Sequence, residues 1–143
     1  MKVGKGFSGK DGTEIDIFES PLYKRKRIRN SVVSNLHYNG YGIDGKSKRL
    51  GAFAADDPYN TFNTYGLEWN EKEYIFYING VETCRSSFGG VSQNEEFMIL
   101  SVEVDGVGGR PVFGWSGNIE NNPEGTLPVD FVIDYVRVYE YKE

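Results

Sequence analysis

The segment Tyr74-Ile75-Phe76-Tyr77-Ile78-Asn79-Gly80-Val81 combines a run of aromatic and β-branched residues with a turn signal. Aromatic and β-branched residues favour strands. Asn-Gly is the residue pair that a two-residue type I′ turn prefers, because both turn residues need a positive φ. The segment therefore predicts a β-hairpin with strands over residues 74–78 and 81–85.

Similar segments recur along the chain. We expect further strands over residues 13–19, 32–38, 61–69, 97–104 and 131–139, separated by connections rich in Gly, Pro or Asn. Aromatic residues make up 15% of the chain and Gly occurs 18 times, while long runs of helix formers are missing. This composition favours an all-β sandwich. The length of 143 residues predicts a single domain over residues 1–143.

Composition also excludes several classes of partner. A net charge of −5 argues against nucleic acid, which requires a basic face, and the basic residues 24–27 are expected in a solvated loop. No apolar run is long enough to span a membrane, so no membrane partner is expected. Residues 1–6 lack the apolar core of a signal peptide. The single cysteine, Cys84, excludes an intrachain disulfide.

Three acids, Glu14, Asp16 and Glu19, occur in one predicted strand with apolar residues between them. Side chains alternate between the two faces of a strand, so Glu14 and Asp16 share a face and simple alternation sends Glu19 to the other. One extra residue bulged out at Ile17-Phe18 brings Glu19 back to the first face. We therefore expect a bulged strand with three acids in a row.

Such a row has two interpretations. Like charges on one strand form a solvated face that discourages aggregation. In a cleft, two carboxyl groups about 5 Å apart are the pair that a retaining glycosidase needs. Glu14 would then be the nucleophile, Asp16 would share a proton with it, and Glu19 would donate a proton after neighbouring charges raise its pKa.

The acid-bearing residues 11–21 (DGTEIDIFESP) resemble the catalytic strand of family-16 glycoside hydrolases, the laminarinase and lichenase group. The resemblance continues through residues 36–42 (LHYNGYG), 64–69 (TYGLEW), 76–82 (FYINGVE) and 133–139 (IDYVRVY), in the order of the family. Because it covers nearly the whole chain, it favours the glycosidase interpretation.

The resemblance implies a concanavalin-like jelly-roll β-sandwich whose cleft hydrolyses internal β-linked glucan bonds with retention of configuration. By match, Glu14 is the nucleophile, Asp16 its helper and Glu19 the acid/base. The implied substrate is a β-1,3 or mixed β-1,3/1,4-glucan, polysaccharide or oligosaccharide. The implied enzyme is extracellular and requires no cofactor.

The resemblance also points to binding residues. His37 falls beside the acid/base in the family, although a hydrogen-bonded strand histidine is an equal alternative. Ser101 and Glu103 share one face of a predicted strand that lines the family's cleft. Trp115 can stack on a sugar ring or cap the core. Several relatives bind a structural calcium ion through an acid of the last strand, here Asp134.

The position of the acid motif departs from the family pattern. In the family it lies in mid-domain, whereas here it begins at residue 14. We therefore expect the C-terminal portion of a family-16 catalytic domain, incomplete at its N-terminus; a reduced relative and a chain that pairs with another chain are the alternatives. The unpaired strands of such a sandwich favour self-association. Two alternatives to a hydrolase stay open: a carbohydrate-binding sandwich without turnover, and an inactive fragment that needs the missing N-terminal strands.

Overall fold

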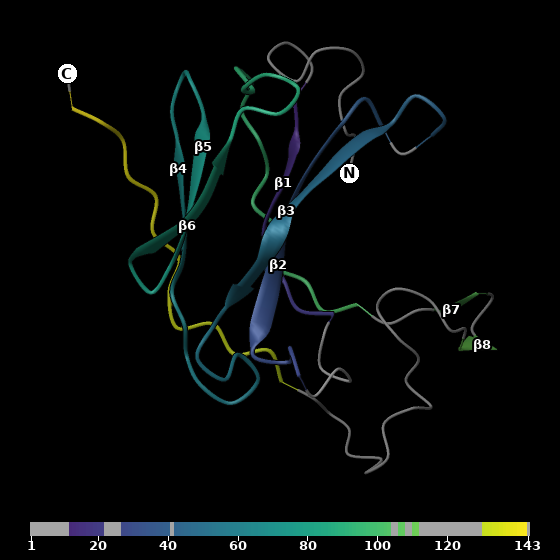
Figure 1. Cartoon of the computed structure of the whole chain (residues 1–143), viewed down its shortest axis with the longest axis vertical. Helices are drawn as coiled ribbons and strands as arrows, with labels where there is room; N and C mark the ends of the chain where they lie inside the picture. Colours follow the sequence, from purple (N-terminus) through teal and green to yellow (C-terminus); the bar gives the residue numbers. More distant parts are fainter. Residues whose placement is uncertain are drawn as a thin grey trace. The chain divides into compact units, whose positions relative to one another are not determined.

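The computed structural model describes residues 12–21, 27–40, 42–103, 106–107, 110–111 and 130–142. The chain divides into two compact units, Met1–Met98 and Ile99–Glu143, which we describe separately. The described residues contain antiparallel strands and no helix, so the predicted all-β class is confirmed (Figure 1). Within these residues, no helix has the length and apolar character needed to cross a membrane.

The first unit contains two antiparallel sheets of three strands each (Figure 1). One sheet has the order β1-β2-β3, formed by β1 (Glu14–Glu19), β2 (Ser31–Tyr38) and β3 (Lys46–Ala54). The other has the order β4-β5-β6, formed by β4 (Tyr65–Trp69), β5 (Tyr74–Ile78) and β6 (Val81–Ser86). Neighbours in the sheet are thus neighbours in the sequence.

The turn between β5 and β6 is the one that the sequence predicts. Asn79 has a φ of 51° and Gly80 a φ of 78°, and the flanking residues Ile78 and Val81 pair across the turn. Two positive φ values are what a type I′ turn requires. The predicted hairpin is therefore confirmed.

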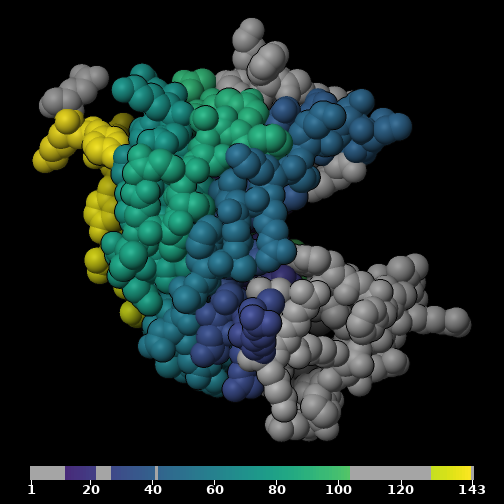
Figure 2. All heavy atoms as spheres, in the orientation of Figure 1, coloured from purple at the N-terminus to yellow at the C-terminus, as the bar shows by residue number. Residues whose placement is uncertain are grey.

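The core of the first unit lies between the two sheets. Leu36 of β2 packs with Tyr74 and Phe76 of β5, and a second cluster joins Val32 of β2 to Ile78 of β5. In the space-filling view, the blue residues of β2 and β3 lie directly against the teal and green residues that follow (Figure 2). These apolar contacts between strands of both sheets make the unit a sandwich, as predicted.

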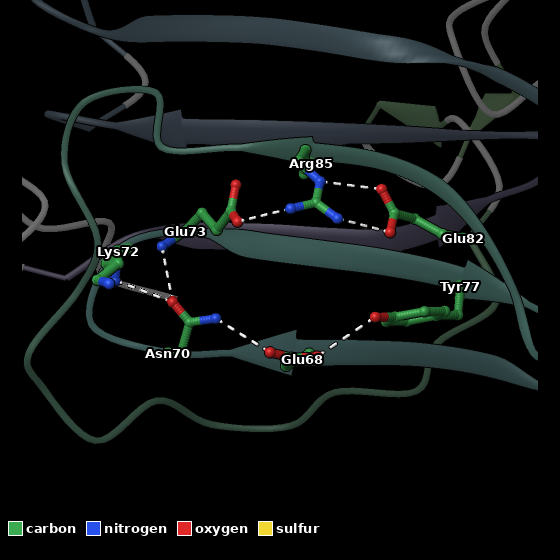
Figure 3. Close-up of polar contacts among 7 residues, drawn as sticks. All are labelled: Glu68, Asn70, Lys72, Glu73, Tyr77, Glu82 and Arg85. Atoms are coloured by element: carbon green, nitrogen blue, oxygen red, sulfur yellow. Dashed lines mark hydrogen bonds and ion pairs between the residues drawn. The ribbon is translucent and has the colours of Figure 1, made fainter.

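Polar side chains on the outer face of the second sheet contact one another (Figure 3). Arg85 of β6 donates two hydrogen bonds to the carboxylate of Glu82 and a third, of 2.9 Å, to Glu73. On the same face, the Tyr77 hydroxyl donates to Glu68. The alternation along each strand thus separates these polar side chains from the residues that pack in the core.

Several predicted strands differ from the observed ones. β3 was expected to be mostly a connection, because charged residues and glycines hide its pattern, yet it pairs with β2 along its length. β4 begins at Tyr65, later than the expected residue 61. The described residues of the predicted strands 97–104 and 131–139 form no ladder, so these predictions were wrong. In the second unit, the described ladder joins β7 (Gly106–Val107) and β8 (Arg110–Pro111).

Candidate active site

The acid-bearing strand β1 contains the predicted bulge. Asp16 pairs with Asn35 of β2 and Glu19 pairs with Val33, so Ile17 and Phe18 together oppose one residue of β2. Two residues against one is the defining count of a β-bulge. The extra residue predicted at Ile17-Phe18 is therefore confirmed.

The bulge decides which way the acids face. Ile15 and Phe18 both pack against the core clusters between the sheets. Since neighbouring side chains on a strand point to opposite faces, Glu14 and Asp16 lie on the face away from the core, and so does Glu19. Without the extra residue, Ile15 and Phe18 could not share a face.

Hydrogen bonds and charge interactions connect the three acids. The Asp16 and Glu14 side chains are hydrogen-bonded to each other. Asn35 on β2 is hydrogen-bonded to Asp16 and donates through Nδ2 to Oε2 of Glu19. Glu19 in turn lies within the electrostatic reach of both Asp16 and Glu14. One amide therefore bridges the two ends of the bulge.

This environment alters the protonation of two acids. Burial, followed by the negative charge of Glu14 and the hydrogen bond with it, raises the pKa of Asp16 to about 7. Burial and the charge of Asp16 raise the pKa of Glu19 to about 7, against the opposing effects of His37 and Asn35. Loss of hydration and repulsion between like charges both favour the neutral acid. Near neutral pH, each carboxyl can therefore donate or accept a proton.

His37 lies directly beside these acids. It pairs with Glu14 across β1 and β2, and its Nε2 lies 3.1 Å from Oδ2 of Asp16. Its Nδ1 lies 2.7 Å from Oγ of Ser47 on β3. His37 is thus both a hydrogen-bonded strand histidine and a neighbour of the acids, so the two interpretations from the sequence are compatible.

Glu14, Asp16 and His37 each offer one atom suited to binding a cation, all within 4.8 Å of one another. The same groups are hydrogen-bonded or ion-paired among themselves. These mutual contacts account for the grouping, and we assign no ion to it.

The other predicted site residues belong to the second unit. Ser101 and Glu103 are exposed, and Ser101 Oγ donates to Glu103 Oε1 over 3.3 Å, but not within a strand. Asp134 is exposed and also lies outside any strand. Trp115 falls outside the described residues. The roles of these four residues in binding sugar or calcium stay predictions.

The sequence interpretation missed two neighbours of the acids. Asn35 precedes His37 by two residues on one strand, so alternation alone places both on the same face. Ser47 lies on β3, which was not predicted as a strand, and its position beside His37 follows from the register between β2 and β3.

Curated relatives resemble this chain at low identity. It is 24% identical over 132 residues to Endo-1,3-1,4-beta-glycanase EglC of Rhizobium meliloti (strain 1021), covering 90% of this chain and 25% of that protein. It is 28% identical over 131 residues to a Beta-glucanase of Brevibacillus brevis, covering 92% of this chain and 39% of that protein. No solved structure gives a significant match.

The chain spans less than half the length of these relatives. Their low identity does not assign a family, but a match to a family model does. The family model described as glycosyl hydrolases family 16 matches residues 3–102, which is more than half of the chain and includes β1 to β6. The chain therefore belongs to glycosyl hydrolases family 16.

Proposed function

We propose that this chain carries the catalytic acids of a retaining, endo-acting β-glucanase that cleaves β-1,3 or mixed β-1,3/1,4-glucans. Membership of glycosyl hydrolases family 16 supports a hydrolase, and the names of the relatives support a β-glucan substrate. The bulge in β1 is the observation that carries the proposal, because it turns Glu19 to the face that Glu14 occupies. A double displacement needs two carboxyl groups in one cleft, flanking the scissile bond of the bound sugar.

In the first step, the Glu14 carboxylate attacks the anomeric carbon and forms a glycosyl–enzyme ester. Glu19 donates its proton to the glycosidic oxygen as that bond to carbon breaks. A pKa of about 7 keeps a large share of Glu19 protonated near neutral pH, which suits a proton donor. Asp16 shares a hydrogen bond with Glu14 and stabilises its charge as it changes.

In the second step, the ionised Glu19 takes a proton from water, and the water oxygen attacks the same carbon. The ester to Glu14 breaks and its carboxylate is restored. Two inversions at one carbon retain its configuration. Glu19 acts first as acid and then as base, so a pKa close to the working pH serves both steps.

Other residues have proposed supporting roles. His37 would contact the sugar beside the acids, and Ser101, Glu103 and Trp115 would contribute to sugar binding along the cleft. Asp134 would supply one oxygen ligand to a structural calcium ion. The proposed location is extracellular, where polymeric glucans occur.

The test is hydrolysis of laminarin and barley β-glucan. We expect reducing ends to appear with the unaltered chain and to be lost in Glu14→Ala, while far-UV circular dichroism stays unchanged. Glu71→Ala removes an exposed carboxylate elsewhere and should retain activity. Proton NMR of early products should show the β-anomer first. Binding of glucan without release of reducing ends would contradict the proposal and favour a carbohydrate-binding module.

A further inference from the structure

Ser34 is a polar residue at an apolar position. Its neighbours on the same face of β2, Val32 and Leu36, are 0% and 1% exposed, and Ser34 itself is 2% exposed. A buried hydroxyl is costly unless it forms a hydrogen bond. Ser34 Oγ forms one by donating to the backbone carbonyl of Ile17, at 2.8 Å.

The partner of this hydrogen bond is a bulge residue. Ser34 is the one β2 residue that opposes both Ile17 and Phe18, and its hydroxyl reaches the first of them. A bulge interrupts the regular ladder at this point. The hydroxyl therefore adds a side-chain contact where the backbone pairing is irregular.

The register at this point controls the direction of Glu19. A shift of one residue in a strand sends every following side chain to the opposite face. If the bulge closed, Glu19 would point toward the core and away from Asp16. A contact that holds Ile17 therefore acts on Glu19 without touching it.

We propose that Ser34 is a positioning residue for Glu19, because its hydroxyl holds the bulge in the register that turns Glu19 toward Glu14 and Asp16. The significance of this for hydrolysis rests on the proposed function. The positioning itself does not, since it concerns the direction and surroundings of one carboxyl group.

The surroundings of Glu19 make its direction measurable. On the acid face, Asp16 and Glu14 act on it from β1, His37 acts on it from β2, and Arg49 of β3 lies opposite Asn35 in the register. On the core face, Phe18 stacks on Tyr65 of β4, with ring centroids 3.9 Å apart. A change in the bulge would therefore move Glu19 away from its acidic neighbours and toward the core face.

The test is an NMR titration of the Glu19 carboxyl carbon in isotope-labelled protein, with the signal assigned from Glu19→Gln. In Ser34→Ala we expect the pKa of Glu19 to rise above about 7, because a carboxyl turned toward the core is more deeply buried and loses the Asn35 amide and His37, which lower its pKa. Ser34→Thr keeps the hydroxyl and should keep the pKa of Glu19 at about 7.

The second sheet offers a matched control. Thr83 lies in the bulge between β5 and β6, where its Oγ1 donates to the carbonyl of Phe76 at 3.1 Å. Thr83→Ala removes the same kind of contact away from the acids. It should leave the pKa of Glu19 at about 7. An equal shift in both variants would show a general loosening of the sandwich and overturn the proposal.

If Ser34→Ala does not fold, Ser34→Cys decides, because a thiol of similar size is a weak donor. An unchanged Glu19 pKa in whichever of these variants folds would overturn the positioning role. Where the unaltered chain hydrolyses glucan, the folded variant should lose at least tenfold in kcat with little change in KM, and its pH profile should shift to higher pH. If the unaltered chain does not hydrolyse glucan, the proposed function fails, while the titration still tests the role of Ser34.

Discussion

Several groups shift the pKa of the Glu19 carboxyl in opposite directions. Burial and the charges of Asp16 and Glu14 favour the protonated form, whereas His37 and the Asn35 amide favour the ionised form. The Asn35 amide acts in the same sense on Asp16. A single uncharged side chain therefore lowers the pKa of two acids, a role that its residue type does not reveal.

Replacing Asn35 tests this balance. Asn35→Ala removes a hydrogen bond that stabilises the ionised form, so the pKa values of Asp16 and Glu19 should rise further. A hydrogen bond to a charged group contributes about 1.5 kcal/mol, or about one pKa unit. We expect the high-pH limb of the glucan hydrolysis profile to move up by about one unit. Asn60→Ala, which removes an amide bonded to Asp57 in an exposed loop, should leave the profile unchanged; an identical profile for Asn35→Ala would contradict this account.

At the residue scale, the sequence predicts which acids share a face of β1, because side chains alternate along a strand. Glu14 and Asp16 follow from spacing alone, and the bulge that brings Glu19 to them was predicted and is found. The partners on neighbouring strands were not predicted. Ser47 reaches His37 only through the register of β2 with β3, and that register depends on pairing between distant segments.

At the element scale, the β5–β6 hairpin depends on two residues with unusual backbone angles. Gly80 has a φ of +78°, and nothing lies within 4 Å of the position that a Cβ would take. A side chain at this position would therefore meet no steric clash with neighbours. Its cost would come from the backbone conformation alone.

Gly80→Ala should lower the free energy of unfolding by about 1–2 kcal/mol, since a left-handed conformation disfavours a Cβ. Urea unfolding followed by circular dichroism measures the change. Gly66→Ala in the adjacent strand β4 is the control, because its Cβ would make ordinary contact, 3.5 Å from Cβ of Tyr77, without a positive φ. Equal destabilisation by both substitutions would show that the turn angle is not the cause.

The ion pairs on the outer face of the second sheet should have only a small effect on stability. Arg85 contacts both Glu73 and Glu82, but its side chain is 50% exposed. Water and salt screen exposed ion pairs, so these pairs contribute little to stability. Arg85→Ala should therefore lower the urea midpoint only slightly, and less so in high salt. A loss comparable to that of a core substitution, or one unaffected by salt, would contradict this interpretation.

The prediction of strands failed where the pattern of side chains along a segment does not match the pairing of its backbone. β3 begins with Lys46, Lys48 and Arg49 near Gly51, a pattern typical of a connection, yet its backbone completes the ladder with β2. The residues 131–139 show the opposite case. Their apolar residues are typical of a buried strand, but a strand also needs a paired neighbour, and these residues form no ladder.

At the scale of the whole molecule, the raised acid pKa values make stability depend on pH. In the folded state Asp16 and Glu19 have pKa values of about 7, compared with ordinary values of 3.8 and 4.5. At pH values between the ordinary and the raised pKa values, the folded chain binds more protons than the unfolded chain. The contribution of both acids to stability is therefore largest below pH 4 and decreases as the pH rises to 7.

Glu19→Gln removes one of these acids and should make the protein more stable than the unaltered chain at pH 8, by about 1–2 kcal/mol after solvent screening. At pH 4 the difference should disappear, because the acid is then neutral in both states. Urea unfolding at both pH values measures it, with Glu71→Gln as a control for an exposed acid. A gain of the same size at pH 4 would mean that charge is not its source.

Cys84 of β6, the chain's single cysteine, packs against the cluster of Leu36, Tyr74 and Phe76, and burial raises the pKa of its thiol. An electrophilic reagent that reacts with the thiolate should modify Cys84 slowly while the two sheets stay together. The rate of Cys84 modification in dilute denaturant would then report how often the two sheets open transiently. Transient opening of the sandwich can thus be measured at this native cysteine, without introducing another labelling site.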